Sequence, residues 1–238
     1  DQSRRNLEKL TPAERVYALV RQRGDVAQQK QWLPVNHAGG TGERVFTRLS
    51  GQPLNDGIPG VYTREGFYKA FLPALDAVQK EVQEQSWVMG DKEGPAAPQM
   101  EQVRARVLEL YFADYVRVWD EMLNDIRIVP MEDVQQTVTV LNMVSGPDMP
   151  MLKLLRAVAD ETRLSVPPGV DPNDAAAVAA AAANVPVGAN GVTQHFQPIA
   201  DFVTPVDGAP ARVEDLLRLL SNAYEELSAV ASGPANGQ

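Results

Sequence analysis

The chain has 238 residues and a formal net charge of −9, with 31 acidic residues against 22 lysines and arginines. Such a chain repels DNA or RNA unless a local basic patch intervenes, and the sequence has none, so no nucleic-acid partner is expected. The absence of cysteine excludes disulfides and thiolate metal sites. No run of 18 apolar residues is present, so no membrane span is predicted. The chain starts without methionine or a signal peptide, and we expect it to be a piece of a longer protein.

The first predicted elements are helices. Residues 2–10 form one helical stretch, and a second helix begins at Thr11. Thr11 and Glu14 are spaced as a capping box, and Pro12 takes the first helical position, where its missing N–H costs no hydrogen bond. This second helix ends near Gly24, and a short polar helix follows it.

Residues 35–60 differ from the helical segments on both sides. Two glycine clusters flank the alternating run ERVFTRL, which predicts a short strand and allows a short β-hairpin near residues 43–56. The stretch HAGGTGERVF in this region resembles a phosphate-binding loop. It lacks the Gly-Lys-Ser/Thr ending that contacts the phosphates and magnesium, so we interpret it as a flexible loop and expect no cofactor.

The stretch IPGVYTREGFYKAF at 58–71 predicts a turn followed by a helix. Pro59 and Gly60 are a turn pair, because proline presets one φ angle and glycine permits unusual ones. Thr63 is a good N-cap, and Glu65 in the first turn opposes the helix dipole. The phrase therefore sets the direction in which a helix leaves its loop.

The helix from Thr63 is expected to end near residues 87–90 and to kink just before Pro73, because proline removes one backbone hydrogen bond. A long helix follows over 99–127. Its apolar residues cover most of its circumference, which predicts a core helix with neighbours on two sides. Residues 131–144 form another helix.

The C-terminal third changes in composition. Asp148 is predicted to cap a helix with Pro150 in its first turn. An alanine-rich segment between proline- and glycine-rich ends then reads as a linker that is partly helical, and two helices follow near 194–202 and 211–230. The fold class is all-α, an elongated multi-helix bundle. The predicted domains are a helical domain at 1–165, the linker at 166–192 and a C-terminal helical segment at 193–238.

Candidate catalytic residues are sparse. His37 lies in the glycine-rich loop and His195 at a short helix, and each is interpreted as structural or exposed. A zinc site or a Ser-His triad needs convergent partners that the sequence does not indicate. No catalytic, cofactor-binding or metal site is therefore predicted.

Acidic residues occur in pairs. Asp120 lies on the solvent face of its helix, where solubility explains it. Asp125 and Asp160 lie nearer helix C-termini, where a carboxylate is unfavourable unless a cation or amide satisfies it. We expect a structural ion pair at these positions, with Arg127 or Arg163 as the cation.

Four phrases occur together and in order: IPGVYTREGFYKAF, SWVMG at 86–90, LYFADYVRVWDEMLNDIRIVP at 110–130 and LLRAVADETRLS at 154–165. Together they resemble the IcmF/TssM family, the large inner-membrane component of the type VI secretion envelope complex. The resemblance covers residues 1–165 well and the C-terminal helices more loosely. The matching signature residues, taken as structural, are Pro59, Gly60, Tyr62, Thr63, Gly66, Phe67, Trp87, Gly90, Tyr115, Trp119, Asp125, Arg127, Glu161 and Thr162.

The resemblance implies a periplasmic region of an inner-membrane protein, acting as a structural scaffold in protein secretion and not as an enzyme. The implied partners are the outer-membrane lipoprotein TssJ, TssL and sister TssM-like subunits, the first two mainly through regions outside this chain. The family's cytoplasmic domain and its terminal β-rich domain are not expected in these residues. Two alternatives stay open: a cell-wall-acting enzyme fragment with an acidic cleft, and a cytoplasmic helical adaptor with an exposed apolar groove.

Overall fold

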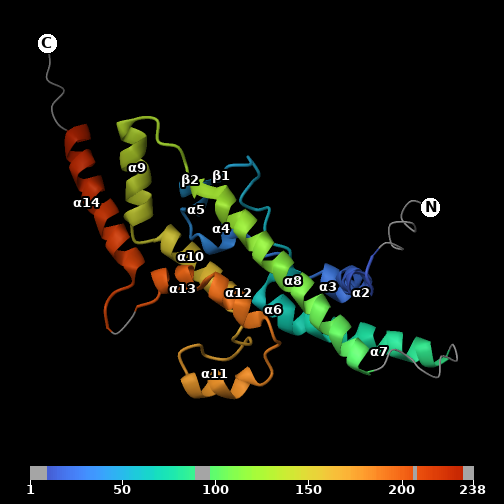
Figure 1. Ribbon diagram of the computed structural model, residues 1–238. Coiled ribbons are helices and arrows are strands. Elements are labelled where there is room, and N and C mark those ends of the chain that lie inside the picture. The colour runs from blue at the N-terminus through green and yellow to red at the C-terminus, as the bar shows by residue number, and fades with distance from the viewer. Residues whose placement is uncertain (1–9, 89–96, 206–207, 233–238) are drawn as a thin grey trace, which may run out of the picture. The chain divides into compact units, whose positions relative to one another are not determined.

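The protein is mostly α-helical in the computed structural model, which describes residues 10–88, 97–205 and 208–232 (Figure 1). This confirms the fold class, whereas the helix predicted at 2–10 lies outside the described residues. The chain folds into two compact units, each assembled from three separate stretches. The division predicted at 165 and 192 stays a prediction. Unit 1 comprises Asp1–Gln31, Ile58–Asp120 and Glu161–His195, and unit 2 comprises Trp32–Gly57, Glu121–Asp160 and Phe196–Gln238.

Unit 1 has an aromatic core. Its elements are α2 (Pro12–Gln22), α3 (Gly24–Ala27), the 3₁₀ turn η1 (Gly60–Tyr62), α6 (Arg64–Gly66), the π-helical turn η2 (Phe67–Phe71), α7 (Leu72–Val88), most of α8 (Ala97–Asp125), α11 (Ala175–Ala182) and α12 (Ala189–His195). The rings of Phe71 and Tyr111 stack with centroids 3.9 Å apart. Phe67, Tyr115 and Trp119 are fully buried around them. The apolar residues of α8 thus pack inward, as their periodicity predicts.

Two local features of unit 1 agree with the sequence. Thr11 and Glu14 form the capping box at the start of α2. Thr63 caps α6, because its hydroxyl accepts a hydrogen bond from the amide of Gly66. Just before Pro73, where a kink is predicted, the backbone forms the π-helical turn η2, in which the amide of Leu72 donates to the carbonyl of Phe67. The kink itself stays a prediction.

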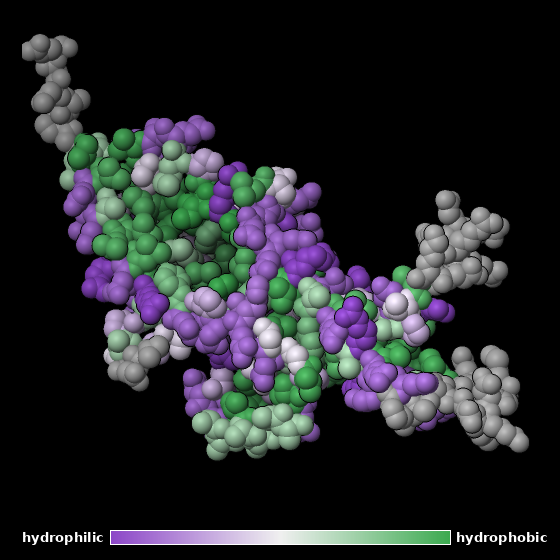
Figure 2. All heavy atoms as spheres, viewed as in Figure 1, coloured by the Kyte–Doolittle hydropathy of each residue, from purple (hydrophilic) through white to green (hydrophobic). Residues whose placement is uncertain are grey.

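Unit 2 is built around a pair of helices. Its elements are α4 (Pro34–His37), α5 (Gly42–Val45), β1 (Phe46–Arg48), β2 (Ile126–Ile128), α9 (Val134–Ser145), most of α10 (Pro150–Thr162), α13 (Gln197–Val203) and α14 (Arg212–Ser232). Helices α9 and α14 lie side by side (Figure 1) and bury Val144 and Leu217. Apolar side chains also gather on the surface of this pair (Figure 2), where Val134, Leu219 and Val230 are exposed.

The predicted strand exists, but its partner lies far away in the sequence. Strand β1 pairs antiparallel with β2, with Phe46 opposite Ile128 and Arg48 opposite Ile126. The helix expected to reach residue 127 therefore ends at Asp125. Two β-branched isoleucines flanking a polar residue favour an extended backbone, and the edge of β1 supplies the hydrogen bonds.

Candidate functional site

The signature phrase Pro59–Phe67 forms a tight turn that only glycines can build. A Cβ atom on Gly60 would lie 2.3 Å from the carbonyl oxygen of Lys30. A Cβ atom on Gly66 would lie 1.9 Å from the carbonyl oxygen of Gly60. Both glycines are buried, so no room exists for a side chain at either position.

Thr63 closes this turn on itself. Its hydroxyl donates to the carbonyl of Gly60 over 2.7 Å and accepts from the amide of Gly66 over 2.9 Å. The side chain is buried, with 9% of its surface exposed. One hydroxyl therefore satisfies an acceptor before α6 and an orphan donor in its first turn.

Two aromatic side chains of α8 bind consecutive carbonyls of the turn. The hydroxyl of Tyr111 donates to the carbonyl of Val61 over 2.7 Å, and the indole N–H of Trp119 donates to the carbonyl of Tyr62 over 2.8 Å. These carbonyls end the 3₁₀ turn η1, where a helix leaves its acceptors unpaired. The long helix thus fixes the turn through polar contacts as well as packing.

The segment at 161–162 joins the same place. The hydroxyl of Tyr115 donates to the carbonyl of Glu161 over 2.8 Å. The carboxylate of Glu161 accepts from the amide of Arg64 over 2.9 Å, at the start of α6, and Thr162 is buried. Signature residues far apart in sequence therefore meet in unit 1. Together with Tyr111, which was not among the predicted signature residues, they form what we call the signature cluster: Gly60, Tyr62, Thr63, Gly66, Phe67, Tyr111, Tyr115, Trp119, Glu161 and Thr162.

Other signature residues lie elsewhere. Pro59 is exposed beside the turn. Trp87 belongs to α7, and Gly90 lies outside the described residues. Asp125 and Arg127 belong to unit 2, where Arg127 is exposed on β2.

Asp125 forms the structural ion pair that its position predicts, but with a different cation. Its carboxylate accepts from the Nε atom of Arg48 over 2.6 Å and from the amide of Ser50 over 2.7 Å. Side-chain exposure is 14% for Asp125 and 12% for Arg48. The hydrogen bonds of Ser50, together with Arg48, lower the pKa of Asp125 to about 2. For Asp125 the expected partner Arg127 is therefore wrong, because the strand pairing brings Arg48 to the end of α8.

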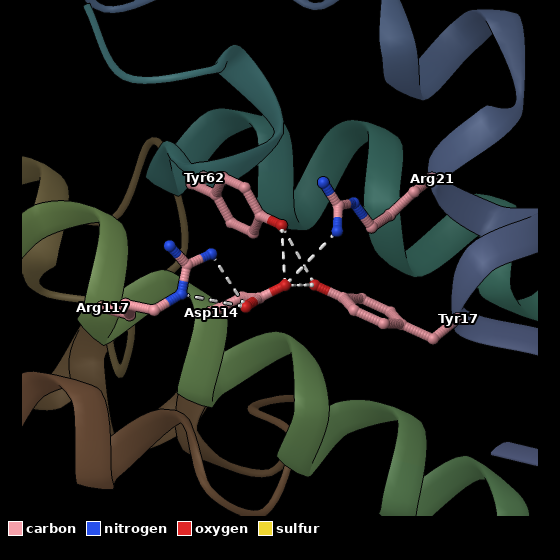
Figure 3. A network of polar contacts seen from close by, with 5 residues as sticks. All are labelled: Tyr17, Arg21, Tyr62, Asp114 and Arg117. Atoms are coloured by element: carbon pink, nitrogen blue, oxygen red, sulfur yellow. Dashed lines mark hydrogen bonds and ion pairs between the residues drawn. The ribbon is translucent and has the colours of Figure 1, made fainter. Parts of the chain in front are cut away.

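A polar network that the sequence analysis missed lies beside the signature cluster (Figure 3). Asp114 on α8 accepts from the hydroxyls of Tyr17 over 2.7 Å and Tyr62 over 3.2 Å. Arg117 donates to it over 3.0 Å, and Arg21 lies 3.4 Å away. The available signal was a carboxylate at Asp114, one helical turn after the core residue Tyr111 and one turn before an arginine.

The pKa shifts in this network identify its donors. Burial raises the pKa of Tyr17 and of Tyr62, so both phenols stay protonated. Burial alone would raise the pKa of Asp114, but hydrogen bonds from Tyr17, Arg117 and Tyr62 outweigh it and lower that pKa. The network is thus an ionised acceptor held by neutral and cationic donors that link α2, η1 and α8.

The two histidines lie in separate units and have aromatic or acidic neighbours. The ring of His37 stacks on Trp32 at 4.7 Å, and burial lowers its pKa. The Nε2 atom of His195 lies 2.9 and 3.0 Å from the two carboxylate oxygens of Asp120. Within the described ranges, no three His, Cys, Asp or Glu side chains gather where they can hold a metal ion.

Comparison with known proteins identifies the family. Residues 1–163 match the model of a family described as IcmF-related, intracellular multiplication and human macrophage-killing. The chain belongs to the IcmF-related family. It is also 38% identical over 164 residues to "Type VI secretion system component TssM1" of Pseudomonas aeruginosa strain PAO1, an alignment that covers 68% of this chain and 14% of that protein. The chain thus spans about a seventh of that relative's length. No solved structure matches the chain.

In this IcmF-related chain the buried phenols act as hydrogen-bond donors. Burial raises the pKa of Tyr111 and of Tyr115 well above the usual value, so neither supplies a phenolate nucleophile. Both hydroxyls point at backbone carbonyls instead. Among the described residues, no helix combines the length and the apolar character that a membrane crossing requires. The arrangement is suited to fixing backbone geometry.

Proposed function

We propose that this chain is a structural scaffold segment of the type VI secretion membrane complex, in the periplasmic part of a TssM-like protein. It acts by holding a defined shape for protein–protein assembly and catalyses no reaction. Membership of the IcmF-related family and the similarity to a type VI secretion component support this role. Its partners are sister TssM-like subunits, with TssJ and TssL bound mainly through regions outside this chain.

One observation carries the proposal: the three aromatic donors that α8 contributes to the signature cluster all bond to backbone carbonyls of the same unit. Tyr111, Tyr115 and Trp119 are fully buried, and each donates to a carbonyl. A catalytic group must instead be within reach of a substrate. These side chains therefore determine the shape of unit 1, and the signature residues Glu161 and Thr162 belong to the same arrangement.

The proposal is tested in the bacterium that carries the full-length protein, with killing of a susceptible competitor as the measure of type VI secretion. The combined variant Asp120→Asn with His195→Gln removes the exposed acid–imidazole pair. We expect it to retain secretion, because a scaffold needs no such pair. Loss of secretion with normal protein levels would favour the cell-wall enzyme over the scaffold.

The periplasmic location needs a separate test. An epitope inserted in α11, which has no buried residue, should leave the fold intact. We expect protease added to spheroplasts to remove the epitope, whereas intact cells protect it. Protection until the inner membrane is lysed would support the cytoplasmic adaptor instead.

A further inference from the structure

The glycine-rich loop at residues 37–42 encloses a carboxylate of the same unit. The amide and the hydroxyl of Thr41 each donate to the Oδ2 atom of Asp148 over 2.8 Å. The Nζ atom of Lys153 lies 2.5 Å from the other oxygen, Oδ1. The loop that resembles a phosphate-binding motif therefore does contact an anion, and that anion belongs to the protein.

Gly39 makes room for this carboxylate. Its φ angle is +70°, a left-handed conformation that glycine adopts without strain. A Cβ atom at this position would lie 2.6 Å from the Oδ1 atom of Asp148. Both the backbone conformation and the space beside the carboxylate thus require glycine.

Asp148 is not the helix cap that the sequence predicts. Its carboxylate bonds to Thr41 and Lys153, and α10 begins at Pro150. The intervening Met149 has a φ angle of +45°, which is strained for a residue with a side chain. The chain therefore adopts an unfavourable backbone angle directly beside the residue whose carboxylate enters the loop.

We propose that Thr41, Gly39 and Lys153 form a receptor for a small carboxylate, and that Asp148 is its built-in ligand. The two hydrogen bonds of Thr41 and the ammonium group of Lys153 match the two oxygens of one carboxylate. Exposure of 26% for the Asp148 side chain and 51% for Lys153 leaves the site accessible to solvent. These contacts also lower the pKa of Asp148 to about 2, so the ligand is ionised at neutral pH. This site goes beyond the proposed scaffold role and does not depend on it.

The test removes the built-in ligand and supplies another. In the purified 238-residue chain, Asp148→Ala is titrated with sodium formate at constant ionic strength, with sodium chloride as the matched salt. We expect formate to raise the Tm of Asp148→Ala in a saturable manner, by about 3–6 °C at ten times its Kd, and to leave the wild-type Tm unchanged. Adding Thr41→Val together with Lys153→Met to the variant, which removes the hydroxyl and the ammonium donor, should abolish the rise.

Two results would overturn the receptor. The first is an Asp148→Ala chain that responds equally to formate and chloride. The second is a formate response that survives Thr41→Val together with Lys153→Met, because the anion would then bind elsewhere. If Asp148→Ala does not fold in chloride, recovery of its helical circular dichroism in formate becomes the measurement, and failure to recover counts against the proposal. Asp148→Asn serves as the filled-site control, since its amide occupies the position and should prevent the response.

Discussion

Replacing Gly66 with alanine tests the geometry of the turn at Pro59–Phe67. Helix propensity predicts that the replacement raises the free energy of unfolding, whereas the space around Gly66 predicts that it lowers it. Alanine in a helix is ordinarily more stable than glycine by about 0.5–1 kcal/mol. Here the new Cβ atom would lie 1.9 Å from the carbonyl oxygen of Gly60, which is more than 1 Å closer than the roughly 3 Å minimum of real contacts. That oxygen belongs to buried backbone and cannot rotate away, so α6 or η1 must shift. We expect a loss of about 3 kcal/mol, at the upper end of the usual cost of overpacking.

The assay is thermal unfolding followed by circular dichroism, where this loss corresponds to a Tm lowered by about 6–12 °C. Gly191→Ala is the matched control, because this glycine also lies in a helix of unit 1 and a Cβ atom there meets nothing within 4 Å. The control should be neutral or raise the Tm slightly. A Gly66→Ala chain as stable as the control would refute the close approach of η1 and α6.

Three further substitutions probe individual contacts. Thr63→Ala should cost about 1–2 kcal/mol in urea unfolding because it removes the cap of α6, whereas Thr63→Ser should stay near wild type. Tyr111→Phe leaves the buried carbonyl of Val61 without this donor, and a loss of about 1–3 kcal/mol is expected with the ring packing retained. Asp125 has a folded-state pKa of about 2 against about 3.9 in an unfolded chain, so its stabilisation is complete above about pH 5 and is lost as the pH falls to 2. The Tm difference between wild type and Asp125→Asn should therefore be largest at neutral pH and shrink steadily as the pH falls through 2; a difference independent of pH would contradict this account.

The features that sequence predicted well are those set by neighbours within one helical turn. The capping box of Thr11 and Glu14 and the cap at Thr63 each depend on groups three residues apart. Such signals are readable because both partners lie within the same short stretch.

The pairing of the two strands could not be predicted from neighbouring residues. Strand β1 was predictable from its alternation, but its partner β2 follows a 29-residue helix and spans only Ile126–Ile128. Three residues carry too little periodicity to distinguish an extended strand from the last turn of a helix. The same pairing brings Arg48 to Asp125, and for this reason the ion pair was predictable from the acid but its cation was not.

The signature cluster was also beyond sequence reasoning, for a different physical reason. Its aromatic donors bind backbone carbonyls, and since every residue has a carbonyl, the sequence does not indicate which one is used. Tyr111 and Trp119 are eight residues apart on one face of α8 and meet the consecutive carbonyls of Val61 and Tyr62. Positions 111 and 119 therefore need side chains long enough to reach this turn. The path of the turn is itself set by Gly60 and Gly66. It follows that the aromatic donors and the glycines are energetically coupled: once Gly66→Ala has displaced the turn, removing the Tyr111 hydroxyl should cost much less than it does in the wild-type chain.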